Sequence, residues 1–290
     1  MTASFVAQSL LNGILIGGVY ALVAVGLNLI FGVMRIINFA HGSLMMLGMF
    51  TTYWLVSLLQ VDPYLSIFLV IPILFGVGVC FQQVVIHPIM RAPEHNQLLV
   101  TLGVSLFLDN LAVVLWSPDY RVMKTAYADI NYYVGDVSVS LVRLLAFVLA
   151  VGCTASLYFL LKKTDLGKAI RAASEESEGA ELTGINVKKV YLISFGIGSA
   201  CAGVAGAAVA PFFPVYPYVG NLFTITAFVV IVLGGMGSFV GAFAGGVIIG
   251  VADSIGAMLL PAAMKSVISF SLFILILLFK PSGLFGGRIG

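Results

Sequence analysis

Three polar residues interrupt the apolar stretch INFAHGSLMMLGMF at positions 36–49: Asn38, His41 and Ser43. Their amide, imidazole and hydroxyl groups all form hydrogen bonds. At helical spacing, Asn38 and His41 share one face and Ser43 lies on another. Two roles stay open: bonds to neighbouring helices or to the preceding loop, and the lining of a polar path through a helix bundle. In both cases the side chains face protein rather than lipid.

Sequence motifs for hydrolytic chemistry are missing from this chain. A phosphate-binding loop requires Gly, four residues, Gly-Lys and then Ser or Thr. The only Gly-Lys pair, Gly167-Lys168, is followed by Ala169 and has Lys162 where the first glycine belongs. No HExxH, GxSxG or paired-carboxylate pattern occurs either. We therefore expect that the chain is not an enzyme, has no catalytic residue and does not hydrolyse ATP by itself.

Residues suited to metal binding or to a proton relay are scattered. Cys80, Cys153 and Cys201 stand singly in apolar runs without CxxC spacing, so we expect small buried thiols and no metal site. Asp109 and Asp253 are the carboxylates inside apolar runs, and both are expected near a membrane face. A relay of stacked acids is therefore poorly supported.

The composition indicates an integral membrane protein. Apolar residues make up 61% of the chain and charged residues 9%, whereas a soluble domain has about 45–50% and about 25%. Long runs carry no charge, including Val190 to Ala252, and about 20 apolar residues cross the hydrocarbon core as a helix. The in-out alternation of a membrane barrel is missing. We predict an all-α, polytopic helical bundle with about eight to ten transmembrane helices.

The helices are predicted to pack closely. Expected spans lie at residues 5–31, 38–60, 64–86, 97–116, 141–161, 190–210, 222–234, 239–259 and 265–280. Glycines four residues apart, such as Gly13 and Gly17 or Gly246 and Gly250, lie on one helix face. Small residues there let backbones approach one another within the membrane.

The run VLGGMGSFVGAFAGG at 232–246 predicts a broken or re-entrant helix, because its first glycines would loosen a helix at membrane depth. Irregular backbone is tolerated there only if it is buried in protein or lines a wet cavity. A flexible hairpin between the seventh and eighth spans is the alternative. The candidate residues of a translocation path are Asn38, His41, Ser43, Gly234, Gly235 and Gly237.

Basic residues set the expected orientation, because short loops rich in Lys and Arg stay in the cytoplasm. The segment 162–189 carries Lys162, Lys163, Lys168, Arg171, Lys188 and Lys189, so it is placed inside. Alternation from there puts the N-terminus and the segment 117–140 outside and the C-terminus inside. The second span would begin at the cytoplasmic face, just after Arg35.

The inner segment KKTDLGKAIRAASEESEGAELTGINVKK, at 162–189, is more polar than a connection between two spans needs. Its centre, Lys168–Leu182, is rich in Ala, Glu, Lys and Arg and predicts a short cytoplasmic helix. Gly184 falls just beyond, where helices commonly end. We interpret this helix as a docking surface for another protein.

Motifs in this segment resemble a known family. Glu178-Gly179-Ala180, followed by Gly184, is similar to the EAA motif of ABC importer permeases, with Gly179 in place of an alanine. The stretches GLNLIFGVMRIINFAHGSLMMLGMF, VLGGMGSFVGAFAG and KPSGLFG are similar to the permease subunit of branched-chain amino-acid ABC transporters, the LivH type. The resemblance covers nearly the whole chain.

The resemblance implies a translocation subunit that binds no cofactor itself. Two cytoplasmic ABC ATPases would use ATP and Mg, a second related permease or a second copy would pair with the chain, and an extracytoplasmic amino-acid-binding protein would meet the segment 117–140. The chain, 1–290, would be one permease domain in the inner (plasma) membrane, contacting lipid and no nucleic acid. The residues expected to couple it to the ATPases are Asp165, Arg171, Glu178, Ala180 and Gly184.

The substrate is expected to be a branched-chain, hydrophobic amino acid, although a binding protein would largely set that choice. Related permeases for urea, short amides or other amino acids share these motifs. An ion-coupled carrier that works alone and a purely structural membrane scaffold are the alternatives from other classes.

Overall fold

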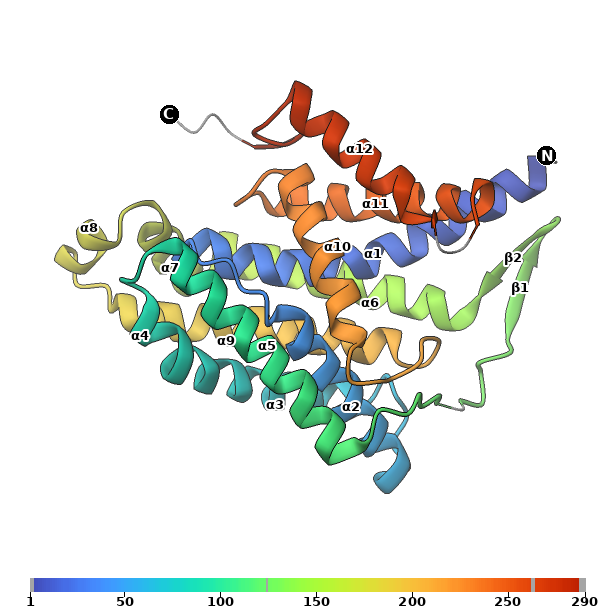
Figure 1. Ribbon diagram of the computed structural model, residues 1–290, viewed down its shortest axis with the longest axis horizontal. Helices are drawn as coiled ribbons and strands as arrows, with labels where there is room; N and C mark the ends of the chain where they lie inside the picture. Colours follow the sequence, from blue (N-terminus) through green and yellow to red (C-terminus); the bar gives the residue numbers. More distant parts are fainter. Residues whose placement is uncertain (1–2, 124, 262–263, 287–290) are drawn as a thin grey trace.

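The computed structural model describes residues 3–123, 125–261 and 264–286, and most of them are helical (Figure 1). The helices are α1 Ala3–Met34, α2 His41–Leu59, α3 Ile67–Phe81, the π-helical turn η1 Gln82–Ile86, α4 His87–Ile89, α5 Glu94–Trp116, α6 Leu141–Lys163, α7 Asp165–Glu175, α8 Ser177–Leu182, α9 Val187–Val209, α10 Val219–Gly234, α11 Phe239–Leu259 and α12 Ser266–Phe279. Within the described residues, seven helices are long and apolar enough to cross a membrane, and α10 and α12 are shorter apolar helices. The predicted polytopic bundle is confirmed, and each predicted span coincides with a helix.

The bundle has two ends that differ in structure (Figure 1). At one end, here named the loop end, lie α4, α7 and α8, and the turn between α10 and α11 faces α7 across a shared cavity. At the other end, named the hairpin end, lie the start of α1 and the antiparallel strands β1 Asn131–Val134 and β2 Val137–Ser140. The polar segments of the sequence are thus separated by the length of the bundle.

α1 runs through the middle of the bundle and packs most extensively against α11, α9 and α6. The α1–α11 contact is made backbone to backbone. A Cβ placed on Gly13 would lie 2.6 Å from the Cα of Val251, and one on Gly17 would lie 2.8 Å from the Cα of Val247. The close packing predicted from the glycine spacing is confirmed, since a side chain at either position would force the helices apart.

α2 begins alongside the middle of α1 rather than level with the end of α1, which differs from the expected start directly after Arg35. The chain leaves α1 at Met34 and returns alongside it without helical structure, so that His41, the first residue of α2, lies level with Val23. Val23 precedes the end of α1 by about 16 Å at the helical rise. At this point the starts of α2 and α10 meet backbone to backbone, where Gly42 contacts Gly220.

The glycine-rich run forms the turn between α10 and α11, the seventh and eighth predicted spans, so it connects two helices as in the hairpin alternative. Gly235 and Gly237 have φ angles of +101° and +88°, a region that favours glycine. Asn28 Oδ1 accepts a hydrogen bond from Gly237 N at 2.8 Å, which places the turn about two helical turns before the end of α1. The segment that follows α12 contacts α10 just before this turn, because Leu284 N donates a hydrogen bond to Leu233 O at 2.8 Å.

The segment 117–140 contains the β1–β2 hairpin, which the sequence analysis missed. The strands pair from Asn131 with Ser140 to Val134 with Val137 around Gly135, which has a φ of +62°. A Gly-Asp turn between alternating residues is a recognised hairpin signal and would have revealed it. The base of the segment is fixed by Arg121, which pairs with Val215 in the link before α10.

Candidate functional site

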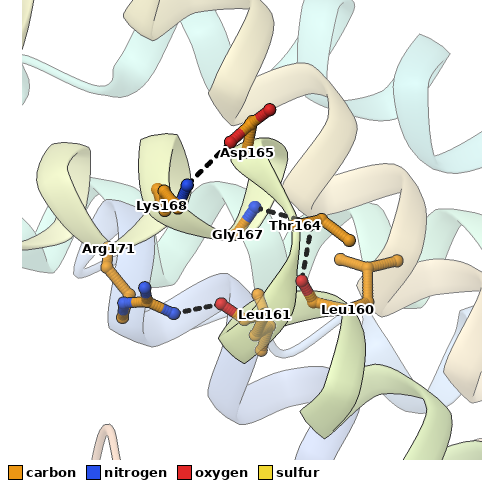
Figure 2. Close-up of polar contacts among 7 residues, drawn as sticks. All are labelled: Leu160, Leu161, Thr164, Asp165, Gly167, Lys168 and Arg171. Carbon is orange, nitrogen blue, oxygen red and sulfur yellow. Dashed lines mark hydrogen bonds and ion pairs between the residues drawn. The ribbon is translucent and has the colours of Figure 1, made fainter.

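α7 is anchored to the end of α6 by three local contacts, which Figure 2 shows. Thr164 caps α7, because its Oγ1 accepts a hydrogen bond from Gly167 N at 3.1 Å. The same hydroxyl donates to the Leu160 carbonyl at 2.6 Å. Arg171 reaches back and donates from Nη1 to the Leu161 carbonyl. α7 is therefore fixed in direction where it leaves α6.

α7 is amphipathic, and its two faces have different environments. Gly167, Ile170 and Ala173 are buried, and the helix packs on α6, α1 and α9. Asp165 and Lys168 lie on the exposed face and form an ion pair at 2.9 Å. The hydrogen bond from Lys168, reinforced by its charge, lowers the pKa of Asp165 below its usual range. A force applied to the exposed face of α7 would be transmitted through its buried face to α6, α1 and α9.

The predicted helix Lys168–Leu182 is in fact two helices, because the backbone at Glu176 is extended, with φ −149° and ψ 103°. α8 ends at Leu182, and Gly184 lies just beyond it as predicted, with a left-handed φ of +88°. Ile185 N donates to Ala180 O at 3.1 Å and Gly184 N to Glu181 O at 3.0 Å, which closes the helix end.

The surface of α8 is exposed and carries both acidic and apolar groups. Glu178 and Glu181 are exposed, and Leu182 is 90% exposed at the tip. Ala180 is buried, with 4% of its surface exposed, where α8 contacts α9. An exposed leucine flanked by carboxylates at the end of a short helix is suited to contact another protein.

Asn38 and His41 are fully buried where α2 begins. Asn38 Oδ1 accepts a hydrogen bond from Ala40 N at 3.1 Å, and His41 Nε2 lies 3.1 Å from the carbonyl oxygen of Val23 on α1. The prediction that these side chains face protein is confirmed. These contacts match the first of the two expected roles, hydrogen bonding to the preceding loop and to a neighbouring helix.

Ser43 belongs to a polar cluster that joins α2, α5 and α10. Its hydroxyl lies 2.9 Å from the hydroxyl of Ser105 and donates to Asp109 Oδ1 at 2.9 Å. Asn221 Nδ2 donates to the other carboxylate oxygen, Oδ2, at 3.1 Å. Asp109 is fully buried rather than placed at an aqueous surface. Its carboxylate is held by neutral donors, which is the way an isolated acid is stabilised inside a bundle.

A cavity of about 780 Å³ lies at the loop end between α7 and the glycine-rich turn. α7 contributes Arg171, Ser174 and Glu175, and the turn contributes Gly237 and Ser238. The ends of α1 and α6 complete the wall. The polar helix α7 and the glycine-rich turn between α10 and α11 therefore border the same space.

Comparison with known proteins agrees with this geometry. The family model described as branched-chain amino acid transport system / permease component matches residues 9–277. This chain belongs to that family. The high-affinity branched-chain amino acid transport system permease protein LivH of Salmonella typhimurium is 31% identical over 96% of this chain and 95% of the relative, and BraD of Pseudomonas aeruginosa, similarly described, is 32% identical over the same shares. A probable LivH permease of Methanocaldococcus jannaschii is 29% identical over 95% of this chain and 91% of the relative.

This permease is a multi-pass membrane protein and the membrane subunit of a transporter. Of its expected coupling residues, Asp165, Arg171, Glu178 and Gly184 are exposed at the loop end, whereas Ala180 is buried. Of its expected path residues, Gly237 lines the loop-end cavity. Gly234 packs against Gly241 on α11, and Gly235 packs against Gly286, which follows α12. Asn38, His41 and Ser43 are buried in protein, so a path role for them stays a prediction.

Several important residues of the permease were missed in the sequence. Leu182 shows no signal beyond a leucine in a polar segment, although its position directly before the helix end favours exposure. Thr164 could have been found as a capping residue before Asp165. The expectation of buried cysteines holds for Cys201 but is wrong for Cys80, which is exposed on the apolar surface of α3.

Proposed function

We propose that this permease is the translocation subunit of a binding-protein-dependent ABC importer for branched-chain amino acids. The observation that supports it most is that the anchored helix α7, which leads into the exposed helix α8, faces the glycine-rich turn across one cavity. Its relatives are described as high-affinity branched-chain amino acid permeases, which supports the substrate class.

The proposed mechanism uses α7 and α8 as the coupling segment. Partner ATPases, which use ATP and Mg, would contact Leu182, Glu178 and the exposed face of α7. Their closure would displace α7, and α7 packs on α1, α6 and α9. Bistable packing of this kind converts a small displacement into a change of state. The loop-end cavity would then alternate between open and closed forms.

The arrangement of partners follows from the same proposal. The loop end would face the cytoplasm, so that two ATPases reach α8, with the N-terminus outside and the C-terminus inside. A second permease, either a related subunit or a second copy, would pair with this one. The hairpin end, with the segment 117–140, would receive the extracytoplasmic binding protein. Urea, short amides or other amino acids are the alternative substrates.

Uptake measurements on the complete importer test the proposal. Leu182→Asp and Glu178→Lys are expected to lower the uptake of radiolabelled leucine about tenfold or more, because a charge change at the centre of a docking surface has a large effect. Insertion into the membrane should stay normal, since both side chains are exposed to water. The amount of chain in the membrane is measured by immunoblot.

Glu94→Lys is the matched control, because Glu94 is also exposed near the loop end but lies at the start of α5. It should leave uptake unchanged. Normal uptake and normal ATPase binding in the two α8 variants would overturn the coupling assignment. Leucine uptake that persists without the ATPases would instead favour an ion-coupled carrier. If the importer takes up urea or a short amide but not leucine, the proposed substrate is wrong.

A further inference from the structure

A second cavity, of about 490 Å³, lies in the half of the permease nearer the hairpin end. Residues from α1, α6, α10, α11 and α12 surround it, together with the link before α10. Its size is within the range of small-molecule sites, which is about 300–1,000 Å³. Neither the predicted path residues nor the coupling residues border this space.

The cavity wall carries charges of both signs. Asp253 lies on α11, Arg143 on the first turn of α6, and Lys265 directly before α12. Within the described residues, the one ion pair joins Asp165 and Lys168 at the other end, so these three side chains form no ion pair with one another. Asp253 is partly buried, whereas Arg143 and Lys265 are exposed at the rim of the cavity. A carboxylate without a counter-charge inside a membrane bundle is costly and marks a functional site.

The polar contacts around Asp253 keep its carboxylate in place. Ser269 donates a hydrogen bond to Oδ1 and Tyr20 donates to Oδ2 at 3.3 Å. Both donors are neutral, so the negative charge stays available to a cation. Arg143 donates to Asn12 Oδ1 at 3.1 Å and lies over the ring of Phe212, 6.0 Å from its centre. The exposed guanidinium is thus held at the rim of the cavity by contacts that include no carboxylate.

Aromatic side chains form the apolar part of the wall. The rings of Phe213 and Phe223 meet edge to face at 5.8 Å, and Tyr20 contacts Phe223 at 6.2 Å. Phe223 is 5% exposed, so its ring is held in place by packing. Apolar walls with a few oriented polar groups are the usual form of a small-molecule site.

We propose that this cavity binds a zwitterionic amino acid with an apolar side chain, as a transient site on its way into the permease. The ammonium group would lie at Asp253, the carboxylate at Arg143 and Lys265, and the side chain against Phe213 and Phe223. This inference rests on the proposed transport function and names a binding site for it. An ammonium joined to an anion also occurs in a phosphatidylethanolamine headgroup, and the experiment separates the two ligands.

Binding of radiolabelled leucine to the full chain in phosphatidylglycerol nanodiscs tests the site, with two analogues as competitors. Isoamylamine keeps the ammonium and the side chain, and 4-methylpentanoate keeps the carboxylate and the side chain. Asp253→Asn is expected to weaken leucine and isoamylamine about tenfold and to spare 4-methylpentanoate, because a hydrogen bond to a charged group is lost. Arg143→Gln should weaken leucine and 4-methylpentanoate and spare isoamylamine.

Glu94→Gln and Arg91→Gln, exposed near the loop end, are the matched controls and should bind all three ligands like the wild type. Size-exclusion profiles after heating check that each variant is folded. Lack of saturable leucine binding to the wild-type chain, or equal losses for all ligands in both cavity variants, would overturn the site. Competition of leucine by phosphatidylethanolamine in the nanodisc would assign the cavity to lipid. Leucine uptake by the complete importer is measured in parallel. Uptake without leucine binding in the cavity would overturn only the site, whereas lack of leucine uptake by the importer would overturn the proposed function.

Discussion

Gly42 shows how a single residue sets the position of a helix. A Cβ on Gly42 would overlap the Gly220 carbonyl and the Thr224 hydroxyl, and Gly42 N donates to that hydroxyl at 3.1 Å. We expect Gly42→Ala to destabilise the protein by about 1–3 kcal/mol, as overpacking does. Thermal unfolding in detergent measures this. Gly76→Ala is the control: Gly76 has no atom within 4 Å of its added Cβ, so the variant should be neutral or slightly more stable.

His41 distinguishes a structural role from a path role. Because His41 Nε2 lies 3.1 Å from Val23 O in a fully buried site, we expect His41→Leu to lower the unfolding temperature and His41→Gln, which keeps a donor, to lower it less. Uptake per folded molecule should then be similar in both variants and the wild type. A selective loss of uptake in stable His41→Leu protein would instead place the imidazole in the path.

At this scale the sequence predicts which residues face protein but not their partners. Asn38, His41 and Ser43 stand out because polar groups are expensive in lipid, and all three are buried. The partners Val23 and Asp109 come from distant segments, and no local pattern indicates them. Asp253 and Arg143 were likewise visible as charges, but the cavity that joins them depends on the packing of five helices.

The short helix α8 shows how local propensity acts on an element. Gly179 has no backbone neighbour within reach of an added Cβ, only the flexible side chain of Glu176 at 3.2 Å. Gly179→Ala should therefore make α8 more stable, by at most about 1 kcal/mol. Gly184→Ala should make it less stable, because Gly184 has a φ of +88°. Hydrogen exchange of the segment 177–185 measures both, and faster exchange in Gly179→Ala would contradict the assigned helix.

Hydropathy predicts well where the apolar helices lie, but it does not predict where a helix is interrupted or where it begins. Every predicted span is a helix because about 20 apolar residues in lipid have to satisfy their own backbone. The break at Glu176 has no such origin: α7 buries its apolar face on α6, α1 and α9, whereas α8 makes its main contacts with α7 and α9. The start of α2 beside the middle of α1 likewise involves a contact with α10, which is far away in sequence.

The whole permease is proposed to work by relative movement of α7 and the glycine-rich turn. Ser174 and Ser238 border the loop-end cavity from these two elements. In a background without the native cysteines, we expect a bifunctional thiol reagent that bridges Ser174→Cys and Ser238→Cys to stop leucine uptake, because the cavity can no longer change shape. Each single variant treated alike is the control. Full uptake by the bridged protein would show that this cavity does not move during transport.

The central claim, that a cytoplasmic ATPase binds α8, is tested most directly by crosslinking from position 182. A photoreactive reagent on Leu182→Cys should join the permease to its ATPase, and the thiol should be labelled only from the cytoplasmic side. Tyr132→Cys on the hairpin, 55% exposed, is the control and should be labelled only from outside. Labelling of Leu182→Cys from outside, or an assembled importer in which it reaches no ATPase, would contradict the claim.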